Sequence, residues 1–198
     1  IAVDPSGENQ IILFPGANRA IGHDQIGQAL SAANAGDMLV LQNETNMQAQ
    51  AAQMAQDLGL KVAYAAAPFD AKAVQALLPF LDLLFLNEVE AQQLQQATGK
   101  APDGLGIADV IVTLGARGAR HYSSMTSLVQ DVPALPVTAI DTTGAGDTFT
   151  GYVLSALDRG LPMPQALALA ARAAALMVMR HGTADVIPDL KEVQNARF

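Results

Sequence analysis

Three glycines and two aspartates crowd the front of the stretch AIDTTGAGDTFTGYVLSALDRG, residues 139–160, just before a pattern that indicates a helix. Glycine and aspartate are poor residues for a helix interior, so their place at this junction needs a reason. The first turn of a helix has unpaired N–H groups and a partial positive charge, and glycines let an anion approach that backbone closely. The glycine loop therefore indicates a site for a phosphate, or for the negative charge that develops in phosphoryl transfer.

Asp147 closes the glycine loop and lies in the first turn of the predicted helix, within reach of the same anion site. A carboxylate facing a phosphate would normally repel it, and its coherent chemical role is to accept the proton of a hydroxyl that attacks phosphorus. The simpler interpretation is structural: Asp141, Thr142 or Thr143 caps the helix, and Asp147 only favours the helix dipole. The loop is not a Walker A motif, because the terminal Gly-Lys-Ser/Thr is absent, and its glycine spacing is not GxGxxG.

Other strand ends carry further candidate residues. The segment TLGARG at 113–118 is predicted as a β-turn between two strands, and its glycines would also give a nucleotide a backbone surface to bind. Asn87 is predicted as an N-cap, whereas Glu90 is a candidate to orient Mg²⁺-bound water, because hard cations prefer oxygen ligands. Glu44 follows an apolar strand, where it could hydrogen-bond a polyol or simply lie in a solvated loop.

Composition limits the class of protein. The chain has 198 residues, of which 51% are hydrophobic and 15% are charged, and this argues for a folded domain and against disorder. The formal charge of −8 disfavours nonspecific binding to nucleic acid or to anionic membranes, and no apolar run approaches the roughly 20 residues that span a bilayer. The lack of cysteine excludes disulfides and thiolate sites and fits a cytoplasmic protein, and the 3 histidines show no metal-binding spacing.

Predicted strands and helices alternate along most of the sequence. Strands are predicted at 1–3, 10–14, 37–42, 61–68, 81–87, 109–115 and 119–124, with one or two more in 127–140. Helices are predicted at 24–35, 47–59, 70–79 and 88–99, and two helices after the glycine loop end the chain. The alternation indicates a parallel sheet with helices on both faces. Ligands of such sheets bind outside the carboxyl ends of the strands, which is where the polar residues and glycines gather.

Taken together, these pieces resemble the ribokinase-like (PfkB) family of carbohydrate kinases. The stretch DTTGAGDTFTGY matches the family's carboxyl-side signature, and the segments GENQIILFPGAN, LQNE, LFLNEVEAQQL, VTLGARGA and DTTGAGDTF follow in the family's order. The resemblance covers essentially the whole chain. It implies a three-layer α/β/α fold with a mostly parallel central sheet and a small β lid.

The resemblance also implies ATP-dependent transfer of the γ-phosphoryl group to a sugar hydroxyl, with ribose as the first choice of sugar. Asp147 would be the general base and contact the sugar together with Glu44, while Glu90 would hold Mg²⁺ through water. The implied anion hole consists of Gly144, Ala145 and Gly146. The implied nucleotide-binding residues are Asn87, Thr113, Leu114, Gly115, Ala116, Arg117, Gly118, Gly146 and Ala171. The implied ligands of an activating monovalent cation, usually K⁺, are Asp141, Thr143, Met177, Arg180 and Gly182.

The sequence departs from the family pattern in three ways. Family members carry an amino-terminal segment with the first core strands and most sugar-binding residues, and this sequence does not contain that segment. Residues 1–14 correspond to the end of the lid, and residues 15–198 correspond to the carboxyl-side part of the nucleotide-binding domain. Ala171 stands where an Asn or His often lies beside the adenine, and Val186 where a serine often completes the cation site. Without the first strands the sheet would expose an apolar edge and face, so we expect the 198-residue chain alone to have little or no sugar kinase activity.

Several alternatives stay open from the sequence. Within the family, a fructokinase, a ketodeoxygluconate kinase or a nucleoside kinase is possible, because the discriminating residues lie mostly in the amino-terminal segment. From another class, the chain would be a noncatalytic nucleotide-binding or dimerising remnant. The chain begins with Ile1, so we expect either part of a longer kinase or a natural truncation, with a full-length form that is a homodimer.

Overall fold

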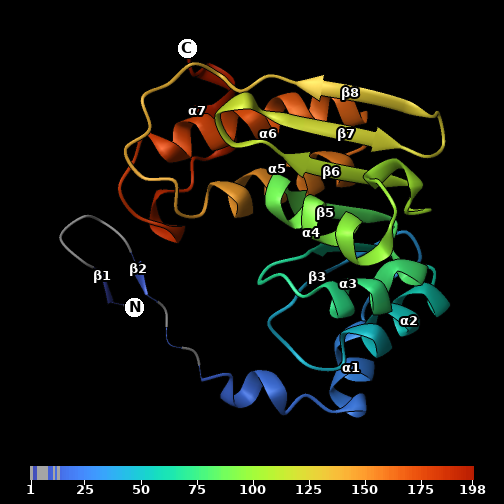
Figure 1. Ribbon diagram of the computed structural model, residues 1–198. Coiled ribbons are helices and arrows are strands. Elements are labelled where there is room, and N and C mark those ends of the chain that lie inside the picture. Colours follow the sequence, from blue (N-terminus) through green and yellow to red (C-terminus); the bar gives the residue numbers. More distant parts are fainter. Residues whose placement is uncertain (1, 4–8, 11, 13) are drawn as a thin grey trace.

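The sheet that carries the candidate site has six strands in the order β3-β4-β5-β6-β7-β8. The computed structural model describes residues 2–3, 9–10, 12 and 14–198 (Figure 1). The strands of this sheet are β3 (Met38–Gln42), β4 (Lys61–Ala65), β5 (Leu83–Asn87), β6 (Asp109–Thr113), β7 (Ala119–Ser123) and β8 (Leu128–Val132). Strands β3 to β6 pair in parallel, whereas β6–β7 and β7–β8 pair antiparallel, so the sheet is mostly parallel, as the sequence predicted.

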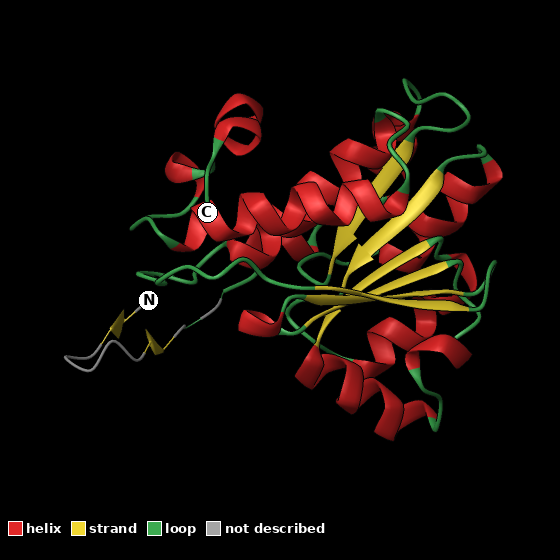
Figure 2. Cartoon of the chain, turned by 90° about the horizontal axis from the view of Figure 1, so that it is seen from above, coloured by secondary structure: helices red, strands yellow, loops and turns green. Residues whose placement is uncertain are grey.

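Helices cover both faces of the sheet (Figure 2). The α-helices are α1 (His23–Leu30), α2 (Gln48–Asp57), α3 (Ala71–Leu77), α4 (Glu88–Thr98), α5 (Ala145–Asp158), α6 (Met163–Val178) and α7 (Leu190–Asn195). Short 3₁₀ turns lie at Gly16–Arg19, Leu78–Phe80, Pro102–Gly104, Gly115–Arg117 and Ala184–Val186. The three-layer α/β/α arrangement predicted from the alternating pattern is confirmed.

Alternate residues of the central strands face opposite helical layers. On β4, Val62 and Tyr64 belong to the core shared with α1 to α4, whereas Ala63 belongs to the core shared with α5 and α6. On β5, Leu84 belongs to the core shared with α1 to α4, and Phe85 belongs to the core shared with α5 and α6. A strand that is buried on both faces must be apolar throughout, which is why these segments read as continuous hydrophobic runs.

Small residues let α5 and α6 pack closely against each other and against the sheet. Ala156 of α5 and Ala166 and Ala170 of α6 are fully buried in the same core as Phe149 and Val153. Alanine loses no side-chain entropy on burial and strongly favours helix, so an alanine-rich segment suits a buried helix. Arg172 interrupts this segment because its guanidinium donates to the carbonyl of Val193, and it thereby ties α7 to α6.

Several boundaries differ from the sequence-based predictions. The helix predicted at 24–35 spans only His23–Leu30, because a turn takes over before Gly36, whose φ is +95°. The prediction that two helices end the chain is wrong, since α7 follows them; Asp189 caps α7 and accepts the N–H of Glu192 in a capping box. The predicted strands at 1–3 and 10–14 correspond to β1 (Ala2–Val3) and β2 (Asn9–Gln10), which form a separate antiparallel pair.

The amino-terminal predictions are tested only in part. Ile12 and Phe14 lie outside any strand, so the strand predicted at 10–14 does not reach its expected end, and residues 1, 4–8, 11 and 13 lie outside the described part of the chain. The division into a lid remnant at 1–14 and a kinase domain at 15–198 stays a prediction.

Strand β3 lies at one end of the sheet order, and within the described residues one of its edges pairs with no strand. Val40, in the middle of β3, is 48% exposed, whereas its partner in the ladder, Ala63, is fully buried. An apolar residue on an open edge of a parallel sheet is unusual, because such sheets are normally covered. The apolar edge expected from the sequence is therefore present at β3.

The turn between β6 and β7 depends on one glycine. Gly118 has a φ of +99°. A Cβ added there would lie 2.0 Å from the carbonyl oxygen of Val132 and 2.5 Å from the nitrogen of Ala134. Gly115, in the same turn, has a φ of +58°, but a Cβ there would meet no atom within 4 Å. An alanine at Gly115 would therefore meet backbone strain alone, whereas an alanine at Gly118 would meet both backbone strain and steric overlap.

We expect Gly118→Ala to cost at least about 3 kcal/mol of unfolding free energy, because backbone strain and a clash with backbone atoms add together. Gly115→Ala is the matched control and should cost about 1 kcal/mol, the penalty for a left-handed alanine alone. Urea unfolding followed by circular dichroism measures both values. Equal losses in the two variants would contradict this account of the turn.

Candidate functional site

The turn that precedes α5 is held by a few specific hydrogen bonds. The N–H groups of Ile140 and Asp141 both donate to the carbonyl oxygen of Val178, at 2.7 and 3.2 Å. The Oδ1 atom of Asp141 accepts the N–H of Thr143 at 2.9 Å. The end of α6 and the entry to α5 are thus joined, and Asp141 shapes the turn. The prediction that Asp141, Thr142 or Thr143 caps the helix is wrong, because the N-cap of α5 is Gly144 and no side chain caps it.

Glycine is needed at the start of α5. Gly144 has a φ of +74°, and a Cβ there would lie 3.2 Å from the Cε atom of Met177. A Cβ added at Gly146 would meet no atom within 4 Å, so the first turn of α5 has open space above it. The N–H of Ala145 is paired, since it donates to the carbonyl oxygen of Thr142 at 3.2 Å. Other N–H groups of a first helical turn have no partner within the helix and attract anions, so this turn can serve as the anion hole predicted from the glycine loop.

Asp147 lies in the first turn of α5 with an exposed side chain. Its Oδ1 atom accepts a hydrogen bond from the Nε2 atom of Gln42 at 3.0 Å. Gln42 is the last residue of β3, and 105 positions separate the two residues in the sequence. The amide holds one carboxylate oxygen in place, which leaves Oδ2 to contact a ligand. Sequence reasoning assigned no role to Gln42, although its place at a strand end was a signal.

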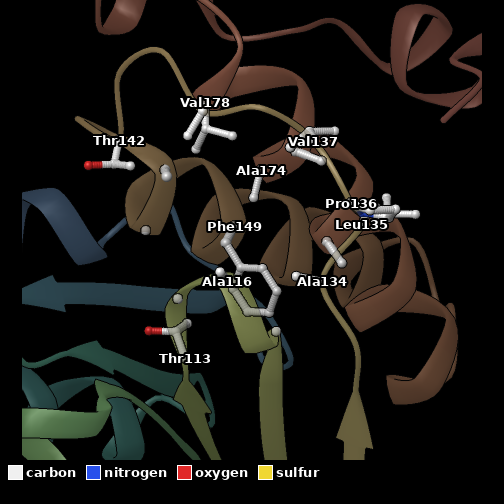
Figure 3. Close-up of a pocket in the computed structure, with 17 residues that line it drawn as sticks. Thr113, Ala116, Ala134, Leu135, Pro136, Val137, Thr142, Phe149, Ala174 and Val178 are labelled. Carbon is white, nitrogen blue, oxygen red and sulfur yellow. The ribbon is translucent and has the colours of Figure 1, made fainter.

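Two cavities lie on either side of the first turn of α5. The first, of about 360 Å³, is lined by Ala145 and Gly146 of α5 together with α6 and the β6–β7 turn (Figure 3). The second, of about 420 Å³, is lined by Asp147 and by residues of β3, including Gln42. Neighbouring residues of one helical turn thus contact different cavities, which is the arrangement needed to place a group between two bound molecules.

The structure brings together most of the nucleotide-binding residues implied by the resemblance, but not all of them. The ones that line the first cavity are Thr113, Gly115, Ala116, Gly118, Gly146 and Ala171. Leu114 packs against the core instead, and Arg117 pairs through its guanidinium with the carboxylate of Glu88, at 2.5 Å. Asn87 is also not among the residues that line this cavity. Residues 134–137 form a wall that sequence reasoning missed, because the segment has no motif and no periodic pattern.

Asn87 and Glu90 form a capping box at the start of α4. The side chain of Asn87 accepts the N–H of Glu90 at 2.9 Å, and Oε2 of Glu90 accepts the N–H of Asn87 at 2.7 Å. Burial raises the pKa of the Glu90 carboxyl, and the hydrogen bond from Asn87 opposes that rise. The N-cap prediction for Asn87 is confirmed. One carboxylate oxygen of Glu90 is free of this box and would be the one to hold a metal-bound water.

Glu44 lies just beyond β3 and lines the second cavity with Asp147. Its side chain is exposed, so it fits both interpretations left open by the sequence, a polyol contact and a solvated loop. Because the cavity holds two carboxylates and an amide beside the apolar Val40 and Leu154, it can offer hydrogen bonds to hydroxyl groups and apolar surface to carbon atoms.

The residues implied for a monovalent cation gather around the loop that follows α6, where Val186 places an apolar side chain beside Gly182. The Cγ1 and Cγ2 atoms of Val186 lie 3.1 and 3.3 Å from the Cβ position of Gly182, so an apolar side chain fills the place of an oxygen ligand. The guanidinium of Arg180 already donates to the carbonyl of Val186 at 2.9 Å. Met177 is buried, and its carbonyl accepts the N–H of Arg180 at 3.1 Å. Asp141 is bound to Thr143 as described above.

The part of the chain that the structure describes contains no group of three or more His, Cys, Asp or Glu side chains that could hold a metal ion. Magnesium in phosphoryl-transfer sites keeps several waters and binds the phosphates of the substrate, so it does not require such a group. In the same part of the chain, no helix has the length and apolar character to cross a membrane.

Comparisons with known proteins place this geometry in a family. The chain matches the pfkB family of carbohydrate kinases over residues 1–190. It is 33% identical to the ribokinase of Haemophilus influenzae over 97% of this chain and 66% of that protein. Its structure is similar to the ribokinase of Thermotoga maritima, with a TM-score of 0.83 and 31% identity over 97% of this chain and 66% of that one.

A further solved structure shows a related protein with ligands. The ribokinase of Arabidopsis thaliana complexed with ribose and ATP has a TM-score of 0.81 and 28% identity, over 97% of this chain and 66% of that one. The chain belongs to the pfkB family of carbohydrate kinases. It spans 66% of the length of the Haemophilus influenzae relative, which is slightly less than two thirds.

The carboxyl of Asp141 gives a pH-dependent test of the turn before α5. The N–H of Thr143 is the main cause that holds the pKa of Asp141 below its usual value. A lowered pKa in the folded chain contributes stability above about pH 4, the ordinary pKa of aspartate, and this contribution is lost as the pH falls through the lowered value.

We therefore expect the difference in unfolding free energy between the unmodified chain and Asp141→Asn to shrink as the pH falls from about 6 to about 3. The asparagine keeps an oxygen that can accept the N–H of Thr143 but removes the charge. Urea unfolding at a series of pH values measures the difference. A difference that stays constant or grows on acidification would contradict the assigned role of Asp141.

Proposed function

We propose that the protein containing this chain is an ATP-dependent carbohydrate kinase that transfers the γ-phosphoryl group of ATP to a sugar hydroxyl, with ribose as the first candidate sugar. One observation carries the proposal: the first turn of α5 lies between two cavities, with Gly146 lining one and Asp147 lining the other. Phosphoryl transfer needs a donor and an acceptor on opposite sides of one phosphorus atom, and this turn offers N–H groups toward the phosphate and a carboxylate toward the acceptor.

The first cavity is the proposed site of the nucleotide. Its apolar lining suits a base, and the N-terminus of α5 suits the phosphates, since N–H groups and the helix dipole favour negative charge there. The β6–β7 turn brings the backbone of Gly115 and Gly118 to the same cavity. These contacts would stabilise the charge on the transferred phosphoryl group as it leaves the nucleotide.

Asp147 is the proposed general base. An acceptor hydroxyl in the second cavity would give its proton to the Asp147 carboxylate while its oxygen forms a bond to the γ-phosphorus. The bond between the γ-phosphorus and the bridging oxygen then breaks, and the electron pair leaves with ADP. The hydrogen bond from Gln42 to Oδ1 would keep the carboxylate directed at the acceptor during this step.

Among the proposed cofactors, Mg²⁺ would neutralise charge on the nucleotide phosphates, with the free oxygen of Glu90 as the contact to one of its waters. We assign no step to K⁺, because Val186 places hydrocarbon where the resemblance puts a serine hydroxyl. The homodimer and the cytoplasmic location stay predictions from the sequence.

Support for ribose over the other sugars comes from the relatives. Curated proteins that are about as similar as the Haemophilus influenzae one carry the name ribokinase, including one from Staphylococcus aureus at 32% identity. Fructokinase, ketodeoxygluconate kinase and nucleoside kinase remain alternatives, because the described residues form only one side of the second cavity, which is the proposed sugar site. Its lining residues come from β3, from Ala65 at the end of β4, from the loop after β3 and from α5.

We expect Asp147→Asn to lower the turnover of ribose by roughly 10²- to 10⁴-fold while leaving the affinity for ATP nearly unchanged, because only the base is removed. The measurement is coupled-assay kinetics and calorimetric ATP binding on the longest natural form that contains these 198 residues. Asp158→Asn, at the exposed far end of the same helix, is the matched control and should keep full turnover.

Two outcomes would contradict the proposal. Full turnover in Asp147→Asn would show that Asp147 is not the base. ATP binding that ribose leaves unchanged, in a protein without any sugar phosphorylation, would favour the alternative of a noncatalytic nucleotide-binding remnant.

A further inference from the structure

The first cavity is apolar at one end and open to hydrogen bonding at the other. Three of its 17 lining residues are glycines and two are threonines, and the other twelve carry only hydrocarbon side chains. The hydrocarbon residues are Ala116, Ala134, Leu135, Pro136, Val137, Ala139, Ala145, Phe149, Ala171, Ala174, Ala175 and Val178. The cavity therefore has few side chains that could read the hydrogen-bonding edge of a bound base.

The two threonines do not face the apolar end. Figure 3 shows Thr113 and Thr142 on the side opposite residues 134–137, with their hydroxyl groups directed away from that wall. The hydroxyl of Thr113 donates to the carbonyl of Leu86 at 3.4 Å. Thr142 precedes α5 and lies beside the proposed phosphate position, so its hydroxyl is placed to contact phosphate rather than base.

We propose that this cavity selects a nucleoside triphosphate by the flat apolar face of its base and by its phosphates, and not by the hydrogen-bonding edge of the base. The chain then accepts purine nucleoside triphosphates as a class, with GTP and inosine triphosphate binding about as well as ATP. This inference rests on the proposed function, because it takes the first cavity to be the nucleotide site.

The expected lack of preference follows from how binding sites discriminate between similar ligands. Strong selection between similar ligands arises where a buried polar group of the protein is left unpaired by the wrong ligand. Burial of apolar surface depends on area, and adenine, guanine and hypoxanthine offer rings of similar area to Phe149 and to the wall at 134–137. Without a polar side chain at that end, none of the three bases is penalised more than the others.

We assign the tolerance for different purine bases to Ala171. It lies on α6 and lines the cavity with a methyl group, so it adds surface and no hydrogen bond. An asparagine at this position would bring one donor and one acceptor into the cavity, and it would then satisfy one base better than another. Ala168 lies on the same helix with an exposed side chain and is not among the lining residues, which makes it a matched control.

The test is calorimetric binding of ATP, GTP, inosine triphosphate and inorganic tripolyphosphate, with Mg²⁺, to the longest natural form that contains these 198 residues. We expect the three nucleotides to have dissociation constants within about three-fold of one another, and each to bind at least about ten-fold tighter than tripolyphosphate, because the base adds apolar burial. Ala171→Asn should separate ATP from GTP by about ten-fold or more, whereas Ala168→Asn should not.

The possible failures can be told apart. ATP binding that is more than about thirty-fold tighter than GTP binding in the unmodified chain would overturn this inference alone, since backbone groups of 134–139 would then read the base edge. Nucleotides that bind no tighter than tripolyphosphate would contradict the proposal that the base binds at the apolar end of the first cavity. Absence of binding by all four ligands would overturn the proposed function and this inference with it. The comparison in the unmodified chain decides the inference even if Ala171→Asn fails to fold.

Discussion

The site depends on a single carbonyl group, that of Val178 at the end of α6. It accepts the N–H groups of both Ile140 and Asp141, and these two bonds place the turn before α5 against the end of the neighbouring helix. The first turn of α5 is thereby fixed relative to α6, which supplies the far wall of the first cavity. If this junction moved, the N–H groups of the turn and the apolar wall would no longer face the same space.

The rest of the fold brings the other parts of the site to this junction. Parallel strands β3 to β6 end at the same edge of the sheet, so Gln42 and Thr113 reach α5 from strands far apart in the sequence. The antiparallel β7 follows from a tight turn at Gly118, where the backbone comes too close to β8 for any other residue. Buried alanines let α6 lie close enough to the sheet to form a wall of the cavity.

Much of the fold could be predicted from the sequence because its signals are local. Apolar runs of strand length alternate with helix formers, and glycines mark the ends of several elements, as at Gly59 and Gly99. The open first turn of α5 and the position of Asp147 in it were predictable for the same reason, since a glycine loop before a helix acts through its own backbone. The N-cap role of Asn87 followed from its position alone.

Features that depend on tertiary contacts could not be predicted. The bond between Gln42 and Asp147 joins residues that only the folded sheet brings together, and the ion pair that turns Arg117 toward Glu88 depends on how α4 sits beside the β6–β7 turn. The wall at 134–137 has no regular structure, so no periodicity marks it. The short helix α7 is too brief for a periodic pattern, although its capping box was a signal that a closer search would have found.

The proposed function requires that the first turn of α5 bind the phosphates of a nucleotide whose base lies in the apolar cavity. Backbone amide NMR of the ¹⁵N-labelled chain, titrated with ATP–Mg²⁺ and separately with AMP, tests this directly. We expect the amides of Ala116 and Gly118 to shift with both ligands, whereas those of Ala145 and Gly146 should shift strongly with ATP and weakly with AMP. Amides of the α5 turn that stay unchanged at saturating ATP would contradict the claim.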